Sequence, residues 1–209
     1  MNRTSAAATS KTVALSAIFG ALAIFCTQLF IPLFFGNPNL GSTPVTIAAV
    51  LCPLPVGVAS GIVKGLGASL WTGQPFIEMP AGIGDAIMAA FTHSIAKRWK
   101  KVHAASLGQL SRYVFTSGMI ALYIGLVASI GATSGPEATV FRGLVARYPW
   151  FSQSTSFLPK VVANILVIWV AISFPAVTLS IIANTFASVL VIGLAGKRIR
   201  DMLLRWGMS

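Results

Sequence analysis

The chain of 209 residues is 56% hydrophobic and only 9% charged, and its formal net charge is +11. Soluble domains carry about 25% charged residues, so this composition excludes an ordinary soluble domain and indicates an integral membrane protein. The basic residues cluster just outside apolar segments, at Arg3 and Lys11, at 97–101 and at 197–205. That placement follows the positive-inside rule and suits contact with membrane lipid, and it leaves no soluble basic face for nucleic acid.

The apolar segments predict an all-α protein with a single transmembrane domain, 1–209, of about six helices in a compact bundle. A crossing needs about 20 apolar residues. The expected segments are 12–35, 44–53, 55–71, 81–99, 107–133 and 158–196. The positive-inside rule places both termini and the turn at 97–101 in the cytoplasm beside the cell membrane, so one net crossing is expected after residue 156. Because 158–196 is too long for one straight crossing, we expect either one kinked helix or two helices divided at Pro175.

The first segment carries small residues at helical spacing. Val13, Ala17 and Ala21 lie on one line, and Gly20 lies beside them. Small residues let two helix backbones approach closely in a membrane. This face therefore suits either packing inside the same bundle or the docking of another membrane subunit through Ala17, Gly20 and Ala21.

The second and third segments are interrupted by proline and rich in glycine. Segment 44–52 would rise only about 13 Å as a helix, far short of the roughly 30 Å hydrocarbon core. Pro53 and Pro55 then break it, and the Gly-rich stretch 56–71 follows with Lys64 inside it. Short, broken helices are tolerated at membrane depth where their backbone is buried in protein or lines a cavity. We therefore expect short helices here, beside a binding cavity.

The fourth segment is expected to begin after a loop at 72–80 that ends in Pro80. It opens with Gly-Ile-Gly-Asp, which puts Asp85 in its first turns, where the helix dipole favours a carboxylate. A G-x-G-D run also occurs in membrane aspartyl proteases, whose chemistry needs two carboxylates that share a proton. The other acids, Glu78, Glu137 and Asp201, fall in expected loops or in the basic tail, so this protease interpretation is disfavoured.

Other catalytic motifs are not found in the sequence. There is no G-x-x-x-x-G-K-[ST] phosphate loop, no H-E-x-x-H pair and no G-x-S-x-G turn. Cys26 and Cys52 lie in apolar segments without metal-like spacing and are expected as buried, inert thiols. We therefore expect no enzyme activity, no cofactor and no metal.

The polar residues within or beside the apolar segments suit contacts to a small molecule, because ligand sites are mostly apolar with a few placed polar groups. The candidates are Asn37, Asn39, Trp71, Gln74, Glu78, Asp85, Tyr123 and Asn164. The last of these suits a hydrogen bond between helices equally well.

Four of the other candidates also have a simpler interpretation. Trp71 suits the aromatic belt at a membrane surface, and Gln74 and Glu78 suit solvated loop positions. Asp85 suits a structural ion pair with Lys64, and for Lys64 itself that structural role is the favoured one.

Four features together resemble the substrate-binding S components of energy-coupling factor (ECF) transporters. They are the size, the first helix ALSAIFGALA with Ala17 and Ala21, the short proline-broken segment before PLPVGVASGIVKGLGASL, and MPAGIGDAIMAAFTHSIAKRW with its basic end. The resemblance implies a six-helix protein that binds a vitamin-like micronutrient with high affinity from the outer side. It also implies a coupling transmembrane subunit, which Ala17 and Ala21 would face, and two cytoplasmic ATPase subunits. The missing phosphate loop agrees with energy supplied by partner chains.

Two other classes of function stay open. One is a stand-alone secondary carrier or a non-catalytic membrane scaffold, and the other is a membrane enzyme or intramembrane protease. The residues do not name a ligand.

Overall fold

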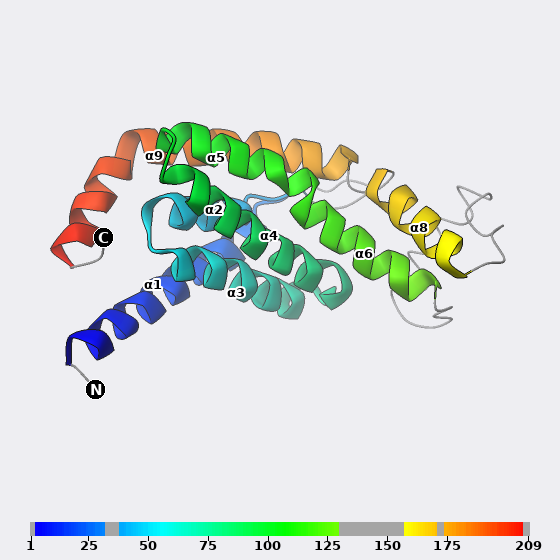
Figure 1. Ribbon diagram of the computed structural model, residues 1–209, viewed down its shortest axis with the longest axis horizontal. Helices are drawn as coiled ribbons and strands as arrows, with labels where there is room; N and C mark the ends of the chain where they lie inside the picture. Colours follow the sequence, from blue (N-terminus) through cyan, green and yellow to red (C-terminus); the bar gives the residue numbers. More distant parts are fainter. Residues whose placement is uncertain (1–2, 32–37, 130–156, 171–173, 207–209) are drawn as a thin grey trace.

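The computed structural model describes residues 3–31, 38–129, 157–170 and 174–206 (Figure 1). Within these ranges the regular elements are all helical. They are α1 (Arg3–Thr27), α2 (Ser42–Leu51), α3 (Leu54–Thr72), α4 (Pro75–Ala96), α5 (Lys101–Leu110), the 3₁₀ turn η1 (Ser111–Tyr113), α6 (Phe115–Ser129), α8 (Phe157–Ile168) and α9 (Phe174–Arg205). The all-helical class predicted from the sequence is confirmed for this part of the chain.

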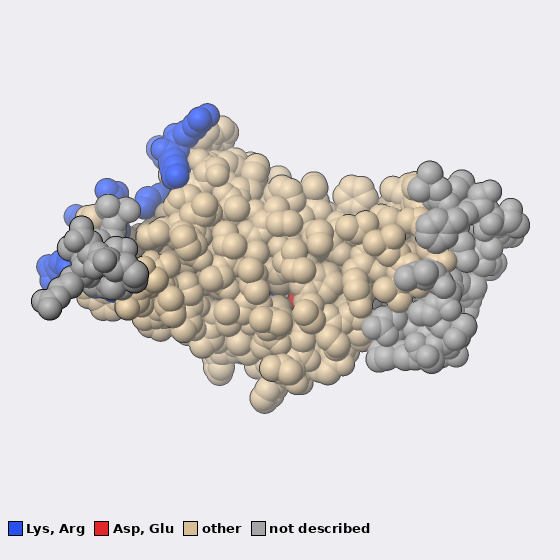
Figure 2. Space-filling model, turned by 60° about the horizontal axis from the view of Figure 1, so that its bottom comes forward, with Lys and Arg blue, Asp and Glu red and all other residues tan. Residues whose placement is uncertain are grey.

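Among the described residues, four stretches are long and apolar enough to cross a membrane, which fits the predicted membrane class. They are Thr9–Thr27, Leu54–Thr72, Lys101–Val127 and Val177–Arg205. The third runs through α5, η1 and α6. Both termini lie at the same end of the bundle (Figure 1). Lys and Arg side chains gather at that end in the view of Figure 2, whereas the middle of that face carries almost no charge.

The centre of the bundle is α2, whose residues 42–50 are all buried. A helix without an exposed polar face is typical of a protein core or a membrane span, and here neighbouring helices enclose it. Ala49 packs with Ala23 of α1 and Met88 of α4, and Val50 packs with Ile192 of α9 on another side. At about 1.5 Å per residue, α2 is about 15 Å long. It therefore occupies only about half the depth of the bundle.

The α3–α4 pair explains the glycines of these segments. A Cβ added at Gly82 would lie 2.5 Å from the Cα of Gly65, and one added at Gly61 would lie 2.6 Å from the backbone nitrogen of Ala86. Real Cβ atoms essentially never approach other atoms so closely. The two backbones are therefore in direct contact, and the glycines permit it.

Two expectations about these helices need correction. The residues 72–80 do not form a loop, because α4 already begins at Pro75 and contains Pro80. Only Gly73, with a φ of 66°, and Gln74 separate α3 from α4, since a left-handed glycine ends a helix within one residue. A proline at the first helical position costs no backbone hydrogen bond, and here Pro75, not Pro80, occupies that position. α3 is also a full-length helix of 19 residues and is not short.

Of the later segments, 107–133 divides differently from the expected range, whereas 158–196 follows the expected alternative of two helices that divide near Pro175. Segment 107–133 begins within α5 and is interrupted by η1. Residues 158–196 contribute to two helices, α8 and α9, and Pro175 is the second residue of α9. α9 continues to Arg205, so the basic cluster at 197–200 lies within the helix.

Candidate functional site

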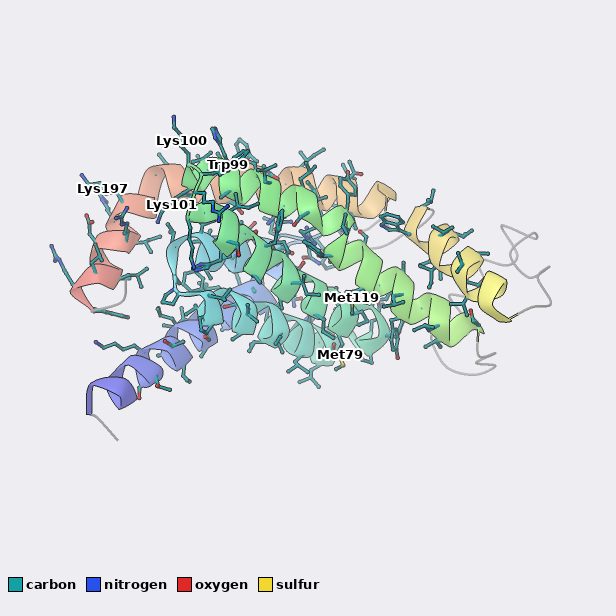
Figure 3. The ribbon with its side chains drawn as sticks, in the orientation of Figure 1. Met79, Trp99, Lys100, Lys101, Met119 and Lys197 are labelled. Carbon is teal, nitrogen blue, oxygen red and sulfur yellow. The ribbon has the colours of Figure 1, made fainter. Side chains whose placement is uncertain are left out.

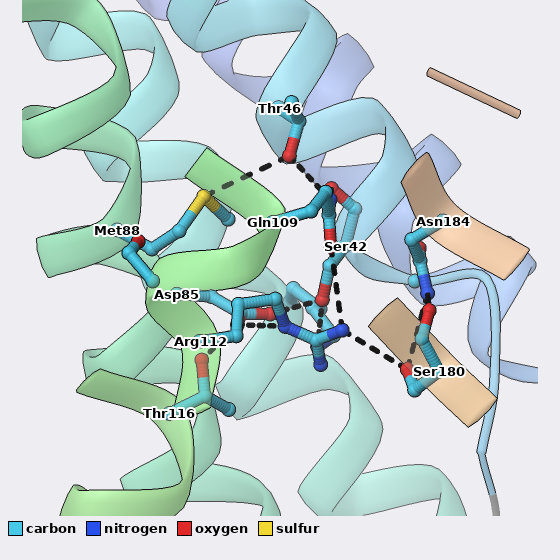
Figure 4. Close-up of polar contacts among 12 residues, drawn as sticks. Ser42, Thr46, Asp85, Met88, Gln109, Arg112, Thr116, Ser180 and Asn184 are labelled. Atoms are coloured by element: carbon cyan, nitrogen blue, oxygen red, sulfur yellow. Dashed lines mark hydrogen bonds and ion pairs between the residues drawn. The ribbon is translucent and has the colours of Figure 1, made fainter. Parts of the chain in front are cut away.

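A buried carboxylate lies at the centre of the bundle (Figure 4). Asp85 of α4 is completely buried, and four side chains from four other elements bind its two oxygens. The Nζ atom of Lys64 lies 2.5 Å from Oδ2, and Nε of Arg112 lies 3.2 Å from Oδ1. Ser42 donates a hydrogen bond of 2.6 Å to Oδ2, and Thr116 donates one of 2.7 Å to Oδ1. We call these five residues the central cluster.

Arg112 connects the central cluster to α5 and α9. Its Nη1 donates to Oγ of Ser180 at 3.0 Å and to Oε1 of Gln109 at 3.5 Å. Nε2 of Gln109 in turn donates to Oγ1 of Thr46 in α2 at 2.6 Å. A buried polar group without a partner costs about 1–3 kcal/mol, so such a network holds its helices in one arrangement.

A second set of hydrogen bonds holds the backbone just before α2 against α9. Nδ2 of Asn184 donates to the carbonyl oxygen of Asn39 at 2.7 Å, and Oγ of Ser180 donates to the same oxygen at 3.1 Å. Oγ1 of Thr43 donates to Oδ1 of Asn184 at 2.8 Å. Non-helical backbone is thus fixed inside the bundle by side chains of α9.

The central cluster lies near the middle of the bundle. Asp85 is about 16 Å along α4 from the end of that helix, by the rise of about 1.5 Å per residue. Its partner Ser42 is the first residue of α2, which begins at the same depth. The structure therefore places the start of a half-length helix beside the buried charges. In transporters, interrupted helices of this kind carry substrate sites.

The charges of this region balance only when a second carboxylate is counted. Lys64 and Arg112 share Asp85, which leaves one excess positive charge. Glu78 lies about two turns earlier on α4, is half-buried, and is close enough to Lys64 for their charges to attract. Among the described residues, the only ion pairs within 4 Å are the two that involve Asp85. The carboxylate of Glu78 is thus a charged group near the cluster without a direct ionic partner in the described parts of the chain.

The structure brings together two of the residues predicted for a substrate site. Asp85 and Asn39 both belong to the connected polar network, Asn39 through its backbone carbonyl and Asp85 at its centre. Glu78 forms no ion pair within 4 Å with this network in the described residues, but its carboxylate is close enough to interact with the charge of Lys64. Asn37 lies outside the described residues.

The other predicted substrate contacts lie elsewhere. Trp71 is 70% exposed, and Gln74 is exposed at the turn between α3 and α4. Tyr123 is 40% exposed on α6. Asn164 is buried in α8, where its Nδ2 donates to Oγ of Ser129 at 3.0 Å while its Oδ1 has no partner. No contact between these four residues and the central cluster appears in the described ranges.

The predicted docking residues of α1 divide between two sides. Ala17 and Ala21 are exposed, together with Val13. Gly20 instead faces α3, where a Cβ would lie 2.5 Å from Cγ1 of Val63. The outward line of small residues is therefore Val13, Ala17 and Ala21, and Gly20 serves the packing of α1 on α3.

Several residues of the network were missed from the sequence, and Arg112 is the most instructive. It lies inside the expected apolar segment 107–133, and an ionisable residue within such a segment is by default a candidate functional group. That rule would have found it. Ser42, Thr116 and Ser180 carry no comparable signal, because small hydroxyl residues are common in membrane helices.

Groups of three or more His, Cys, Asp or Glu side chains that could hold a metal ion do not occur among the described residues. No protein-family model, curated protein or solved structure matches the chain. Function is therefore inferred from the residues and their geometry.

Proposed function

We propose that the chain is the membrane-embedded, high-affinity binding subunit for uptake of a small vitamin-like or other micronutrient. It would work with a coupling transmembrane subunit and two cytoplasmic ATPase subunits. The observation that carries the proposal is the start of the half-length helix α2 at the charged central cluster. Ionisable groups inside a membrane bundle are expensive and usually serve a ligand or ion pathway.

In this proposal the bundle crosses the membrane six times, through α1, α2, α3, α4, α5–α6 and α9. Both termini and the turn at 97–101 would then be cytoplasmic. Their common position at one end agrees with an even number of crossings, and the Lys and Arg residues gathered there favour the cytoplasmic side. The α3–α4 turn, with Trp71 and Gln74, would face the outside. The ligand would bind between this turn and the central cluster, with Glu78 and Asn39 nearest to it.

The docking part of the proposal uses the outward face of α1. Val13 is 62% exposed and Phe25 is 65% exposed, so this face lacks a partner within the described chain. Ala17 and Ala21 would permit close approach of a helix from the coupling subunit.

The test begins with protein purified from its native membrane, followed by mass spectrometry of the small molecules that it retains. The proposal expects a stoichiometric small molecule in the wild type. It also expects clear loss of that molecule in Glu78→Gln and Trp71→Ala. Trp99→Ala is the matched control, because Trp99 is a similarly exposed tryptophan at the basic end. Retention unchanged in both test variants would contradict the site.

The docking face is tested separately with Ala17→Trp. Co-purification of the coupling subunit should be lost while the ligand is retained. Leu70→Trp is the matched control, because Leu70 is 88% exposed on a different helix, α3. If Ala17→Trp assembles like the control, the assignment of this face is wrong.

A stand-alone secondary carrier is the second candidate. One observation favours it: a carboxylate buried between two cations near mid-depth is also the kind of group that relays charge in carriers. If proteoliposomes that contain only the purified chain take up the retained small molecule, the carrier is favoured. Uptake that requires added ATPase subunits and ATP would favour the binding subunit.

A further inference from the structure

A second site lies at the basic end of the bundle, away from the central cluster. A cavity of about 500 Å³ lies there between the end of α2, the beginnings of α3 and α5, and the ends of α4 and α9. Its volume falls within the range of roughly 300–1,000 Å³ that small-molecule sites occupy. Its ionisable lining residues, apart from the Cys52 thiol, are His93, Lys97, Lys101 and Arg200. No described Asp or Glu lines it.

The cations of this cavity lack anionic partners. None of Lys97, Lys101 and Arg200 takes part in an ion pair within 4 Å in the described ranges, where Asp85 accounts for both pairs. Lys101 is half-buried, and the positive charge of Arg200 acts on it directly. Like charges that share one cavity repel each other, so a bound anion would be stabilised by both.

Other cations at the same end are arranged differently. Lys97 and Arg200 are also exposed but line the cavity, whereas the exposed Lys100 and Lys197 point away from the bundle (Figure 3). They do not line the cavity. The basic end therefore contains both cations directed into a cavity and cations directed outward, and these two sets can be compared by experiment.

The cavity lies at the level where the candidate membrane spans end. Leu54 begins the span Leu54–Thr72, Lys101 begins Lys101–Val127, and Arg200 is near the end of Val177–Arg205. Hydrocarbon meets lipid headgroups at this level. The lining also includes Leu54 and Leu204, which are 41% and 49% exposed. One ligand could thus place a negative charge among the cations and an apolar chain against the leucines.

We propose that this cavity binds the phosphate headgroup of an anionic phospholipid, with the acyl chains lying against Leu54 and Leu204. Basic pockets between helices at the cytoplasmic side are suited to such headgroups, because each nearby Lys or Arg strengthens binding. A soluble phosphate compound would use the same cations but would gain nothing from the leucines. The lipid is therefore the better fit.

The experiment uses the purified full chain in detergent and counts bound molecules by native mass spectrometry. The probes are dioleoylphosphatidylglycerol, dioleoylphosphatidylcholine and free glycerol 3-phosphate. The phosphatidylglycerol should bind about tenfold or more tightly than the phosphatidylcholine, and millimolar glycerol 3-phosphate should not displace it. Equal binding of the two lipids would overturn the proposal. Displacement by glycerol 3-phosphate would overturn the lipid assignment and identify a soluble phosphate compound as the ligand.

Two double variants locate the site. Lys101→Gln/Arg200→Gln should weaken phosphatidylglycerol binding by about thirtyfold, the effect of two cations near a headgroup. Lys100→Gln/Lys197→Gln removes the same charge from outward positions and should change binding by less than about threefold. If both double variants lose phosphatidylglycerol affinity equally, the lipid is attracted by the overall positive charge of this end and not by the cavity, and the proposed site is wrong. If Lys101→Gln/Arg200→Gln melts at a lower temperature than the wild type without lipid, the double variant Lys97→Gln/Arg200→Gln is used instead. The same loss of phosphatidylglycerol binding relative to the control variant is then expected.

Discussion

The central cluster and the basic end use the same residue types for different purposes. At the centre, Lys64 and Arg112 are buried and share the Asp85 carboxylate, and side chains of α2, α6 and α9 hydrogen-bond to these charged groups. At the basic end, Lys97, Lys101 and Arg200 line a cavity that no described Asp or Glu lines. Depth explains the difference, because an unpaired charge is costly inside the bundle and inexpensive at the headgroup level. A lysine at the centre therefore fixes structure, whereas one at the basic end is available to a ligand.

The largest effect that would test this comparison is removal of the central carboxylate. Asp85→Ala leaves two buried cations without a counter-charge and should lower the free energy of unfolding by about 3–5 kcal/mol. Thermal or denaturant unfolding in detergent measures it, with expression yield as a first indication. Asp201→Ala is the control, because Asp201 is an exposed acid of the basic end and its loss should cost no more than about 0.5 kcal/mol. Similar stability of the two variants would contradict the structural role of the cluster.

A smaller effect is expected from one hydrogen bond of the cluster. Thr116→Val keeps the shape of the side chain but removes the 2.7 Å hydrogen bond to Asp85, which should cost about 1.5–3 kcal/mol. The neighbouring Ser117 is a matched control, because its Oγ is buried without a hydrogen-bond partner. Ser117→Ala should leave the unfolding midpoint unchanged or raise it. If both variants lose stability equally, hydrogen bonding to Asp85 is not what matters at this position.

The packing around the centre gives a third test. Gly82→Ala places a methyl group against the backbone of α3 and should cost about 1–3 kcal/mol through overpacking. Gly193→Ala in α9 meets no atom within 4 Å and should instead gain up to about 1 kcal/mol from the higher helix propensity of alanine. Opposite shifts of the melting temperature in the two variants would confirm the close α3–α4 contact. A gain in both would exclude it.

The smallest effect concerns reactivity at the basic end. Burial raises the pKa of Cys52 to about 11 from the ordinary value of 9.0, with Lys101 opposing part of the shift. Only the thiolate reacts with a maleimide, so in a Cys26→Ser background the labelling rate should rise about tenfold per pH unit through pH 9. Between pH 9 and about 11 the unfolded thiol loses its proton before the folded one, so the free energy of unfolding should fall as the pH rises. A labelling rate that levels off near pH 9 would show that the thiol is not shielded.

The sequence predicted the membrane class, the helical content and two of the five residues of the central cluster. Lys64 and Asp85 stand out because charges are rare in apolar segments, and their structural pairing was one of the two interpretations that the residues left open. The Gly-rich stretch around Lys64 was also recognised, but the direct contact of Gly65 with Gly82 was not predicted.

What the sequence could not give depends on contacts between distant residues. Ser42 and Ser180 become important only because the fold brings them to Asp85 and Arg112, and no local pattern marks them. Pro80 was expected to end a loop, although a helix tolerates an internal proline when neighbouring helices surround it, and Pro80 is buried against such neighbours. The exposed positions of Trp71 and Tyr123 likewise follow from tertiary packing and not from residue type.

The short central helix also constrains how the protein can be made. Because α2 is about 15 Å long and the hydrocarbon core about 30 Å thick, α2 cannot be inserted as an independent unit by the machinery that recognises long apolar segments. The hydroxyl of its first residue, Ser42, donates to Asp85 of α4 and accepts from Lys64 of α3, and both helices are synthesised later. We therefore expect α2 to settle only with these two helices, and the hydrogen bonds from Ser180 and Asn184 form only after α9 has left the ribosome. Assembly from the outside inward is thus a property of this sequence, and a chain truncated before α9 should expose α2 to quality-control proteases.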